Sequence, residues 1–335
     1  MKIKQFFLIF VYFLLLLIRT QSLFAEDNSW DKLPNIVIIT LLGVRNSESI
    51  EDPAHQYIPN LWNKMFKEGT LYTNLINLNL TFHMPPVQAI NTGKDYPVYW
   101  GISVPSIFQY VGEKYNMPAS KLWSIGHFFS DNCKYYKPDN INPDNSYPCE
   151  INLASKIPSV LRNILSRQEL IFLKFYGELL KKEITLYPIW DSVSLIWYQF
   201  FKKVLKEFKP KLIHYIMEDT ETAHYCTFGR YVLDLRSMDR EIFEIWQMIK
   251  EDPYYKNNTY LIITVDHGRD AYYMEHSDDD ISNVWMYIYG PDIKKGIVIE
   301  RIVHHKDIFA TVAYLMKVET HNNKGKILSD AFLGK

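Results

Sequence analysis

The stretch Tyr260-Leu-Ile-Ile-Thr-Val-Asp-His-Gly268 decides the fold of this chain. Its first six residues form an apolar, largely β-branched run, which is typical of a strand buried on both faces of a parallel sheet. The run ends at Asp266 and His267, so a carboxylate and an imidazole follow the strand directly. Open α/β sheets bind ligands at this edge. The stretch therefore predicts an α/β fold with a site at the ends of its strands.

A second apolar run, residues 211–217, repeats the pattern. Asp219 follows it, His224 comes five residues later, and His276 lies nine residues after His267. Carboxylates and neutral imidazoles are ligands that suit Zn²⁺ and similar divalent ions. A single such residue at a strand end is more often a helix cap or a turn residue. Two Asp/His pairs on two strand ends instead predict a metal cluster.

Strand-like runs alternate with helical stretches along most of the chain. Residues 35–41, 71–76 and 121–125 predict further strands. This alternation is typical of a mostly parallel sheet sandwiched by helices on both faces. A chain of 335 residues with 47% hydrophobic content can bury a large core. We therefore expect one α/β domain over residues 26–335.

The pattern changes between residues 128 and 210. A polar, turn-rich loop at 131–148 precedes two aromatic-rich helical segments, at 157–182 and 189–208. Because this block separates two predicted strands, we expect a helical cap inserted over the strand ends. Two interpretations remain open, since the aromatic side chains either shape a substrate lid or simply pack as core.

The first 25 residues predict an export signal. Met1–Lys4 is basic, residues 6–18 are thirteen apolar residues in a row, and Ala25 precedes two acidic residues. A helix of that length spans only ~20 Å, short of the ~30 Å hydrocarbon core. We therefore expect a cleaved signal peptide at 1–25, a secreted or periplasmic protein, and no stable membrane span.

The three cysteines fit export without proving it. Cys133 and Cys149 bracket the polar loop and are free to pair in an oxidising compartment, which leaves Cys226 as a buried or free thiol. Three unpaired thiols are the alternative, because disulfide geometry is not contained in a sequence.

The charge of the chain argues against nucleic acid as a partner. The net charge is −1, and no tract of lysine and arginine supplies a local basic patch.

In their order along the chain, these residues resemble the alkaline phosphatase superfamily, which includes phosphodiesterases, sulfatases and phosphoglycerate mutases. The resemblance covers most of the chain after about residue 34. Besides the Asp/His pairs, the matching segments are a first strand with its metal loop, a nucleophile helix and a closing helix, at 35–45, 85–93 and 307–313, with shorter matches at 58–62, 68–70 and 289–291.

The resemblance implies two metal sites of unequal quality. It implies a complete first site formed by Asp219, His224 and His276. The second site keeps Asp266 and His267 only, because Leu42 stands where the family has a metal-binding Asp. His83 stands where the family has a Thr, a Ser or a modified Cys as its nucleophile. The covalent hydroxyl nucleophile is therefore missing.

Two functions follow as hypotheses. In the first, His83 joins Asp266 and His267 as a ligand of the second ion, and a secreted Zn²⁺-dependent hydrolase attacks small anionic phosphate or sulfate esters with metal-bound water. In the second, the protein is a catalytically inactive relative that binds a metal ion and serves as a binding or structural protein. Whether the chain is an enzyme stays open at this point, because function belongs to the site and not to the fold.

Overall fold

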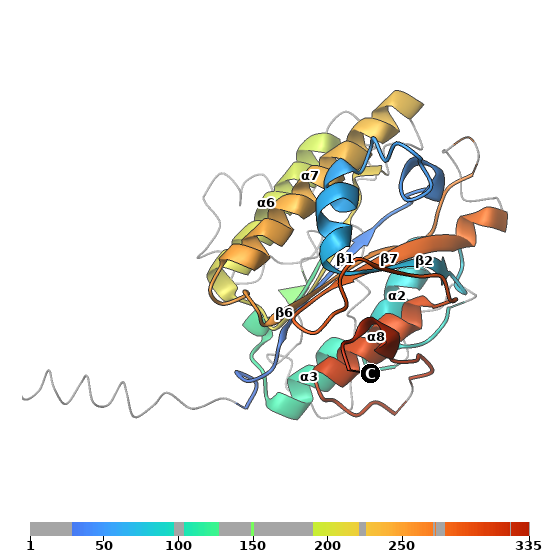
Figure 1. The fold of residues 1–335 in the computed structure, drawn as a ribbon. Coiled ribbons are helices and arrows are strands. Elements are labelled where there is room, and N and C mark those ends of the chain that lie inside the picture. The colour runs from blue at the N-terminus through green and yellow to red at the C-terminus, as the bar shows by residue number, and fades with distance from the viewer. Residues whose placement is uncertain are drawn as a thin grey trace, which may run out of the picture. The chain divides into compact units, whose positions relative to one another are not determined.

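We describe a computed structural model of the chain over residues 29–96, 104–126, 149–150, 190–220, 226–270, 272, 279–321 and 323–334 (Figure 1). Two compact units divide the chain, Met1–Leu33 and Pro34–Lys335. In the first, the described residues form a turn in which the Leu33 N–H donates to the Trp30 carbonyl. The predicted signal peptide at 1–25 lies outside the described residues and stays a prediction.

An eight-stranded sheet forms the centre of the second unit, in the order β4-β3-β5-β1-β6-β7-β2-β8. Neighbouring strands are parallel except at β7, which runs antiparallel to both β6 and β2. The predicted mostly parallel sheet is thus confirmed. The strands are β1 Asn35–Leu41, β2 Thr70–Ile76, β3 Leu122–Ile125, β4 Cys149–Glu150, β5 Leu212–Met217, β6 Thr259–Val265, β7 Asn283–Tyr289 and β8 Ile297–Ile299.

Helices cover both faces of this sheet. Figure 1 shows α2, α3 and α8 on one face and α6 and α7 side by side on the other. The α-helices are α2 Met84–Thr92, α3 Ile107–Tyr115, α6 Trp190–Phe208, α7 Phe228–Glu251 and α8 His305–Leu315. Short helical turns complete the described part: η1 Asn46–Glu48, η2 Leu61–Met65, η3 Phe66–Glu68, η4 Ala119–Lys121, η8 Asp279–Ser282 and η9 Ser329–Ala331. The predicted α/β sandwich is confirmed.

The three central strands end at the same level. All residues of β1, β5 and β6 are buried, as expected for strands with helices on both sides. Leu41, the last residue of β1, is paired with Met217 on one side and with Val265 on the other. The residues that follow these strands therefore emerge together at one edge of the sheet.

The end of the predicted cap belongs to the layer that covers the sheet. Residues 190–208 form α6, and the Phe201 ring stacks on Tyr215 of β5 with centroids 4.5 Å apart. Most of the remaining block, 128–189, lies outside the described residues, so the cap stays a prediction. Cys133 also lies outside them, and its pairing with Cys149 stays untested. Cys226 is a half-buried free thiol.

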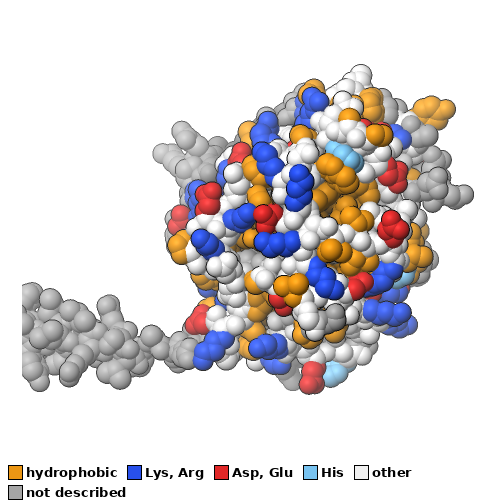
Figure 2. Space-filling model, viewed as in Figure 1, with side chains coloured by type: hydrophobic (Ala, Val, Ile, Leu, Met, Phe, Trp, Pro, Cys, Tyr) orange, Lys and Arg blue, Asp and Glu red, His pale blue; other side chains and the backbone are white. Residues whose placement is uncertain are grey.

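The described surface is mixed in character. Lys and Arg side chains lie among acidic and apolar ones on the face drawn in Figure 2. Within the described residues, we find no helix that combines the length and the apolar character needed to cross a bilayer.

Candidate metal centre

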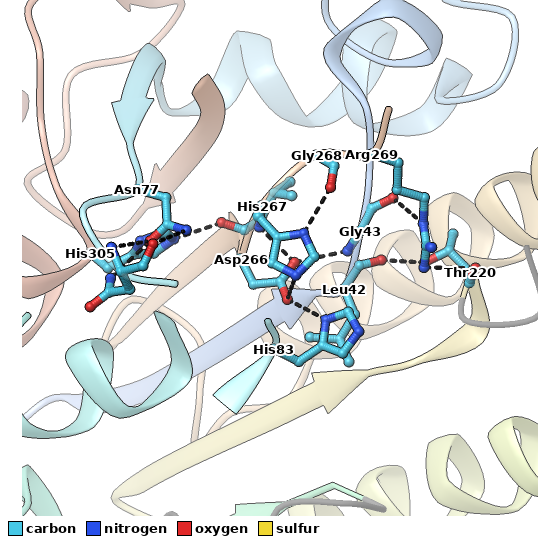
Figure 3. Close-up of polar contacts among 12 residues, drawn as sticks. Leu42, Gly43, Asn77, His83, Thr220, Asp266, His267, Gly268, Arg269 and His305 are labelled. Atoms are coloured by element: carbon cyan, nitrogen blue, oxygen red, sulfur yellow. Dashed lines mark hydrogen bonds and ion pairs between the residues drawn. The ribbon is translucent and has the colours of Figure 1, made fainter. Parts of the chain in front are cut away.

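Asp266 stands directly after β6 and is fully buried. Its Oδ1 accepts the N–H groups of Gly43 at 2.8 Å and of His267 at 2.7 Å, and its Oδ2 lies 2.6 Å from Nδ1 of His83 (Figure 3). Burial on its own raises the pKa of this carboxyl. The imidazoles of His267 and His83 and the N–H donors outweigh burial and lower the pKa to about 2. Asp266 is therefore an anion at neutral pH.

His267 presents an unprotonated ring nitrogen to this anion. Its Nδ1 lies 2.7 Å from the Gly268 carbonyl, which only accepts, so Nδ1 holds the proton. Burial lowers the pKa of the ring to about 4, so the imidazole is neutral at pH 7. Its Nε2 therefore has a lone pair, 3.3 Å from Oδ2 of Asp266. Metal-binding histidines are commonly oriented by such a hydrogen bond from the other ring nitrogen.

His83 comes from a third segment, directly before α2. Pro85 lies in the first turn of that helix, where its fixed φ and missing N–H are favourable. The His83 ring stacks on His267 with centroids 4.8 Å apart and planes 22° apart. Its side chain is 15% exposed, whereas those of Asp266 and His267 are fully buried. His83 thus closes the solvent side of the cluster.

These three residues fit a divalent metal ion. One ligand atom from each lies within 4.8 Å of the others, and this is the only such group of three that we find in the described part of the chain. Two imidazoles and one carboxylate form a donor set typical of zinc, which has bonds of about 2.0–2.2 Å. The lone pairs of His267 Nε2 and Asp266 Oδ2 also repel each other, and a shared cation relieves that repulsion.

Leu42 is part of the apolar core beside the centre. Its fully buried side chain packs with Val87 and Ile216, and Met84 lies against this group. Its backbone is held at both ends, because its N–H donates to the Met217 carbonyl at 3.1 Å and its carbonyl accepts the Thr220 hydroxyl. The position that the family resemblance assigns to a metal-binding carboxylate is therefore an apolar one in this chain.

Asp219 is not part of the group of three. It is 8% exposed and lines a separate pocket with residues of α6 and α7. His224 and His276 lie outside the described residues, so their convergence with Asp219 on one ion stays a prediction. The pocket also holds Glu241 of α7, whose pKa is raised to about 8 by burial and by the negative charge of Asp219.

Sequence reasoning missed the role of Arg269. This guanidinium is 4% exposed; its Nε donates to the Gly43 carbonyl at 3.0 Å and its Nη2 to the Thr220 carbonyl at 3.2 Å. It thereby ties the segments after β1 and β5 to the segment after β6. Gly43, with φ of +60°, leaves room for it, since a Cβ there would lie 2.5 Å from Arg269 Nε. A glycine two residues after a strand was the available signal.

Buried hydrogen bonds between side chains link α2 to the sheet. His214 of β5 lies 2.8 Å from the Thr40 hydroxyl through Nε2 and 2.9 Å from Oδ1 of Asn91 in α2 through Nδ1. Burial lowers the pKa of His214 to about 3, so the ring is neutral. On the α8 side, Nε2 of His305 donates to the Val265 carbonyl at 2.8 Å, directly before Asp266. His305 therefore supports the backbone next to Asp266, and His214 links the side chains of β1 and α2.

Comparison with known proteins places the fold. No protein-family model matches the sequence, and no curated protein is similar to it in sequence. Solved structures do match. A phosphonate monoester hydrolase from Silicibacter pomeroyi superimposes with a TM-score of 0.60 at 14% identity, over 90% of this chain and 77% of that one.

Two further structures agree with this match. Murine ectonucleotide pyrophosphatase/phosphodiesterase 5 gives a TM-score of 0.56 at 11% identity, over 89% of this chain and 100% of that one. A protein in the alkaline phosphatase superfamily from Vibrio parahaemolyticus gives 0.53 at 12% identity, over 89% and 70%. The chain therefore has the fold of the alkaline phosphatase superfamily, and the resemblance seen in its sequence is confirmed at the level of the fold.

Proposed function

We propose that this protein is a metal-dependent hydrolase of small anionic esters, with His83, Asp266 and His267 as the ligands of a Zn²⁺-type ion. The observation behind this proposal is the convergence of the three donors within 4.8 Å. They meet where β6 ends, at the edge that serves ligand binding in open α/β sheets. The fold neighbours support ester or phosphonate chemistry, since one of them is named as a phosphonate monoester hydrolase.

Each ligand has a distinct task in this proposal. Asp266 supplies the negative charge and stays ionised because N–H groups saturate its Oδ1. His267 supplies a neutral nitrogen whose tautomer the Gly268 carbonyl fixes. His83 binds from the more exposed side, where substrate must approach. A bound divalent ion would polarise the ester and activate water for the attack.

Water is the proposed nucleophile because the cluster offers no hydroxyl. The position that the family resemblance assigns to Thr, Ser or modified Cys is His83, and its Nδ1 is engaged with Asp266. We further propose that residues 1–25 direct the protein out of the cytoplasm, and that the substrate is a phosphate, phosphonate or sulfate ester.

The second candidate function is an inactive, metal-binding relative. The apolar packing of Leu42 with Val87 and Ile216 favours it. A carboxylate at that position would add a second negative charge to the centre. Without it, a divalent ion is only half neutralised by Asp266 and binds more weakly.

One experiment separates these functions. Zinc content and affinity would be measured for the wild type, His83→Ala and His267→Ala, together with hydrolysis of p-nitrophenyl phosphate, bis-p-nitrophenyl phosphate, a phenylphosphonate monoester and p-nitrophenyl sulfate. His321→Ala, which changes an exposed histidine, is the control. The proposal expects zinc binding and turnover in the wild type and the control, and loss of both in the other two. Zinc binding without turnover of any ester indicates the inactive relative, and turnover retained by His83→Ala contradicts the proposed ligand set.

A further inference from the structure

A pocket of about 420 Å³ lies between α6, α7 and the end of β5. Most of its lining residues belong to α6 and α7, which cover the face of the sheet opposite α2, the helix that His83 precedes (Figure 1). Its lining residues are mostly polar or charged: Ser194, Leu195, Asp219, Arg230, Leu233, Asp234, Arg236, Ser237, Arg240 and Glu241. The pocket therefore has a chemistry of its own, separate from the His83 centre.

Glu241 is the unusual member of this pocket. It is only 5% exposed, and its Oε2 has no hydrogen-bond donor among the described residues. Leaving a buried polar atom without a partner costs about 1–3 kcal/mol, and more for a charged one. Buried carboxylates are normally paired with a donor, a cation or a metal. The pocket thus lacks a group that would satisfy this oxygen.

Asp219 adds a second carboxylate to the same pocket. It is 8% exposed, and it is the charge that acts most strongly on Glu241. Two acidic side chains facing one cavity repel each other unless one of them is protonated or a cation lies between them. The pair therefore favours a cation in the pocket, which would replace the proton that Glu241 otherwise holds.

The arginines of the pocket have other partners. Arg230 pairs with Asp234 at 2.7 Å, and Arg236 donates to the Gln56 carbonyl at 3.3 Å. Arg240 donates to the Ser237 hydroxyl at 3.0 Å. Arg236 and Arg240 are exposed, so solvent and salt screen their charges, and the positive charge of Arg240 offsets the effect of Asp219 on Glu241 only in part.

Among the described residues that line the pocket, the uncharged and acidic side chains offer oxygen donors only. They comprise the carboxylates of Asp219 and Glu241 and the hydroxyls of Ser194 and Ser237. Oxygen-only sets are typical of Ca²⁺, Mg²⁺ and Mn²⁺, whereas imidazole nitrogens favour zinc. The donors of the pocket and those of the His83 centre therefore suit different ions.

We propose that Asp219 and Glu241 bind a hard divalent cation in the pocket between α6 and α7. This site goes beyond the proposed function, because it uses none of the residues His83, Asp266 and His267. It also gives Asp219 a partner, Glu241, that the family resemblance does not include.

The test is direct binding of Mn²⁺, followed by electron paramagnetic resonance, with Ca²⁺ titrated by calorimetry. The wild type is expected to bind one ion in the pocket, and Glu241→Gln and Asp219→Asn are expected to weaken it at least tenfold. Glu244→Gln, one turn along α7 and 45% exposed, is the matched control and should bind like the wild type. Equal affinity in the wild type and Glu241→Gln overturns the proposal. Thermal melting of each variant separates lost binding from lost folding.

Further variants keep this site distinct from the zinc centre. His83→Ala should abolish zinc binding and leave Mn²⁺ binding unchanged, so failure of one proposal is visible without failure of the other. Loss of the Mn²⁺ signal in His224→Ala or His276→Ala would assign the ion to the first site expected from the family resemblance, and would overturn the pocket site.

Discussion

Asp266 and Glu241 are two buried carboxyl groups whose pKa values are shifted in opposite directions. Asp266 receives two backbone N–H groups on Oδ1 and faces two imidazoles, and its pKa falls to about 2. Glu241 is buried, has no donor on Oε2 in the described part of the chain and faces another carboxylate, and its pKa rises to about 8. Burial raises the pKa of both groups. The difference therefore comes from the neighbours that each carboxylate meets, and those neighbours also determine which ion each region suits.

The largest expected effect is the loss of stability when a carboxylate is introduced at position 42, among apolar side chains. Leu42→Asp should destabilise the protein by at least about 4 kcal/mol. It loses roughly 2 kcal/mol of apolar burial and places an unpaired charge beside Val87 and Ile216. Urea unfolding measures the loss. Leu42→Asn is the uncharged control and should lose less. If Leu42→Asp is as stable as the wild type in the presence of a chelator, the packing described here around residue 42 is wrong.

The next prediction concerns the effect of rising pH on stability through Glu241. A folded pKa of about 8 against an ordinary 4.5 means that the native state holds a proton on Glu241 that the unfolded state has lost. Stability from this group is present below pH 4.5 and declines as pH rises toward 8, by roughly 3 kcal/mol at pH 7. In a chelating buffer, Glu241→Gln should therefore gain stability over the wild type as pH rises. A pH-independent difference between the two proteins would argue against a strained carboxylate.

Falling pH should destabilise the protein through His214, whereas rising pH destabilises it through Glu241. The folded pKa of His214 is about 3, against 6.5 when unfolded, so only the unfolded chain takes up a proton between these values. Stability from this neutral ring is complete above pH 6.5 and is lost as pH falls toward 3, by about 2 kcal/mol at pH 5. Urea unfolding at pH 7 and pH 5 should show a smaller acid loss in His214→Gln than in the wild type. Identical losses would contradict the buried neutral histidine.

The smallest effect is expected for a carboxylate that water already solvates. Glu244 lies on α7 beside Glu241, is 45% exposed, and accepts from Tyr198 at 2.6 Å and Lys202 at 3.1 Å. Because exposed ion pairs contribute little, Glu244→Gln should change stability by less than about 1 kcal/mol. A larger loss, measured by thermal melting, would show that exposure alone does not separate the two glutamates.

The sheet was predictable where its strands are buried on both faces. The β-branched runs of β1, β5 and β6 indicated such strands, and their parallel pairing is confirmed. The antiparallel direction of β7 was not predictable, because an apolar run looks the same in either direction. A proline at a helix start favours the helix, and residues 59–68 do form one continuous helical stretch, which includes η2, Leu61–Met65. Its start is held by Asp239 of α7, which accepts the N–H groups of Asn60 and Leu61 at 3.0 and 2.8 Å. Local sequence does not reveal a cap from so far along the chain.

The centre was predictable only in part. Asp266 and His267 follow from the end of an apolar run, and His83 was identified from its place relative to Pro85 in the family resemblance. Their mutual contacts, including the 2.6 Å approach of His83 to Asp266, come from the structure, and metal binding by these residues stays a prediction. Glu241 could not be recognised from the sequence, and Gly43 was the only signal for Arg269, since the importance of both residues depends on what the fold packs around them.

The fit between Gly43 and Arg269 has an evolutionary consequence. The guanidinium occupies the space that a side chain at position 43 would need, and its Nε donates to the Gly43 carbonyl. Neither position can change freely while the other is kept. Among homologous sequences, the two positions should covary, with a side chain at 43 appearing only beside a smaller residue at 269. A lineage that lost this arginine would be free to remodel the loop after β1, and with it the backbone N–H that helps to keep Asp266 ionised.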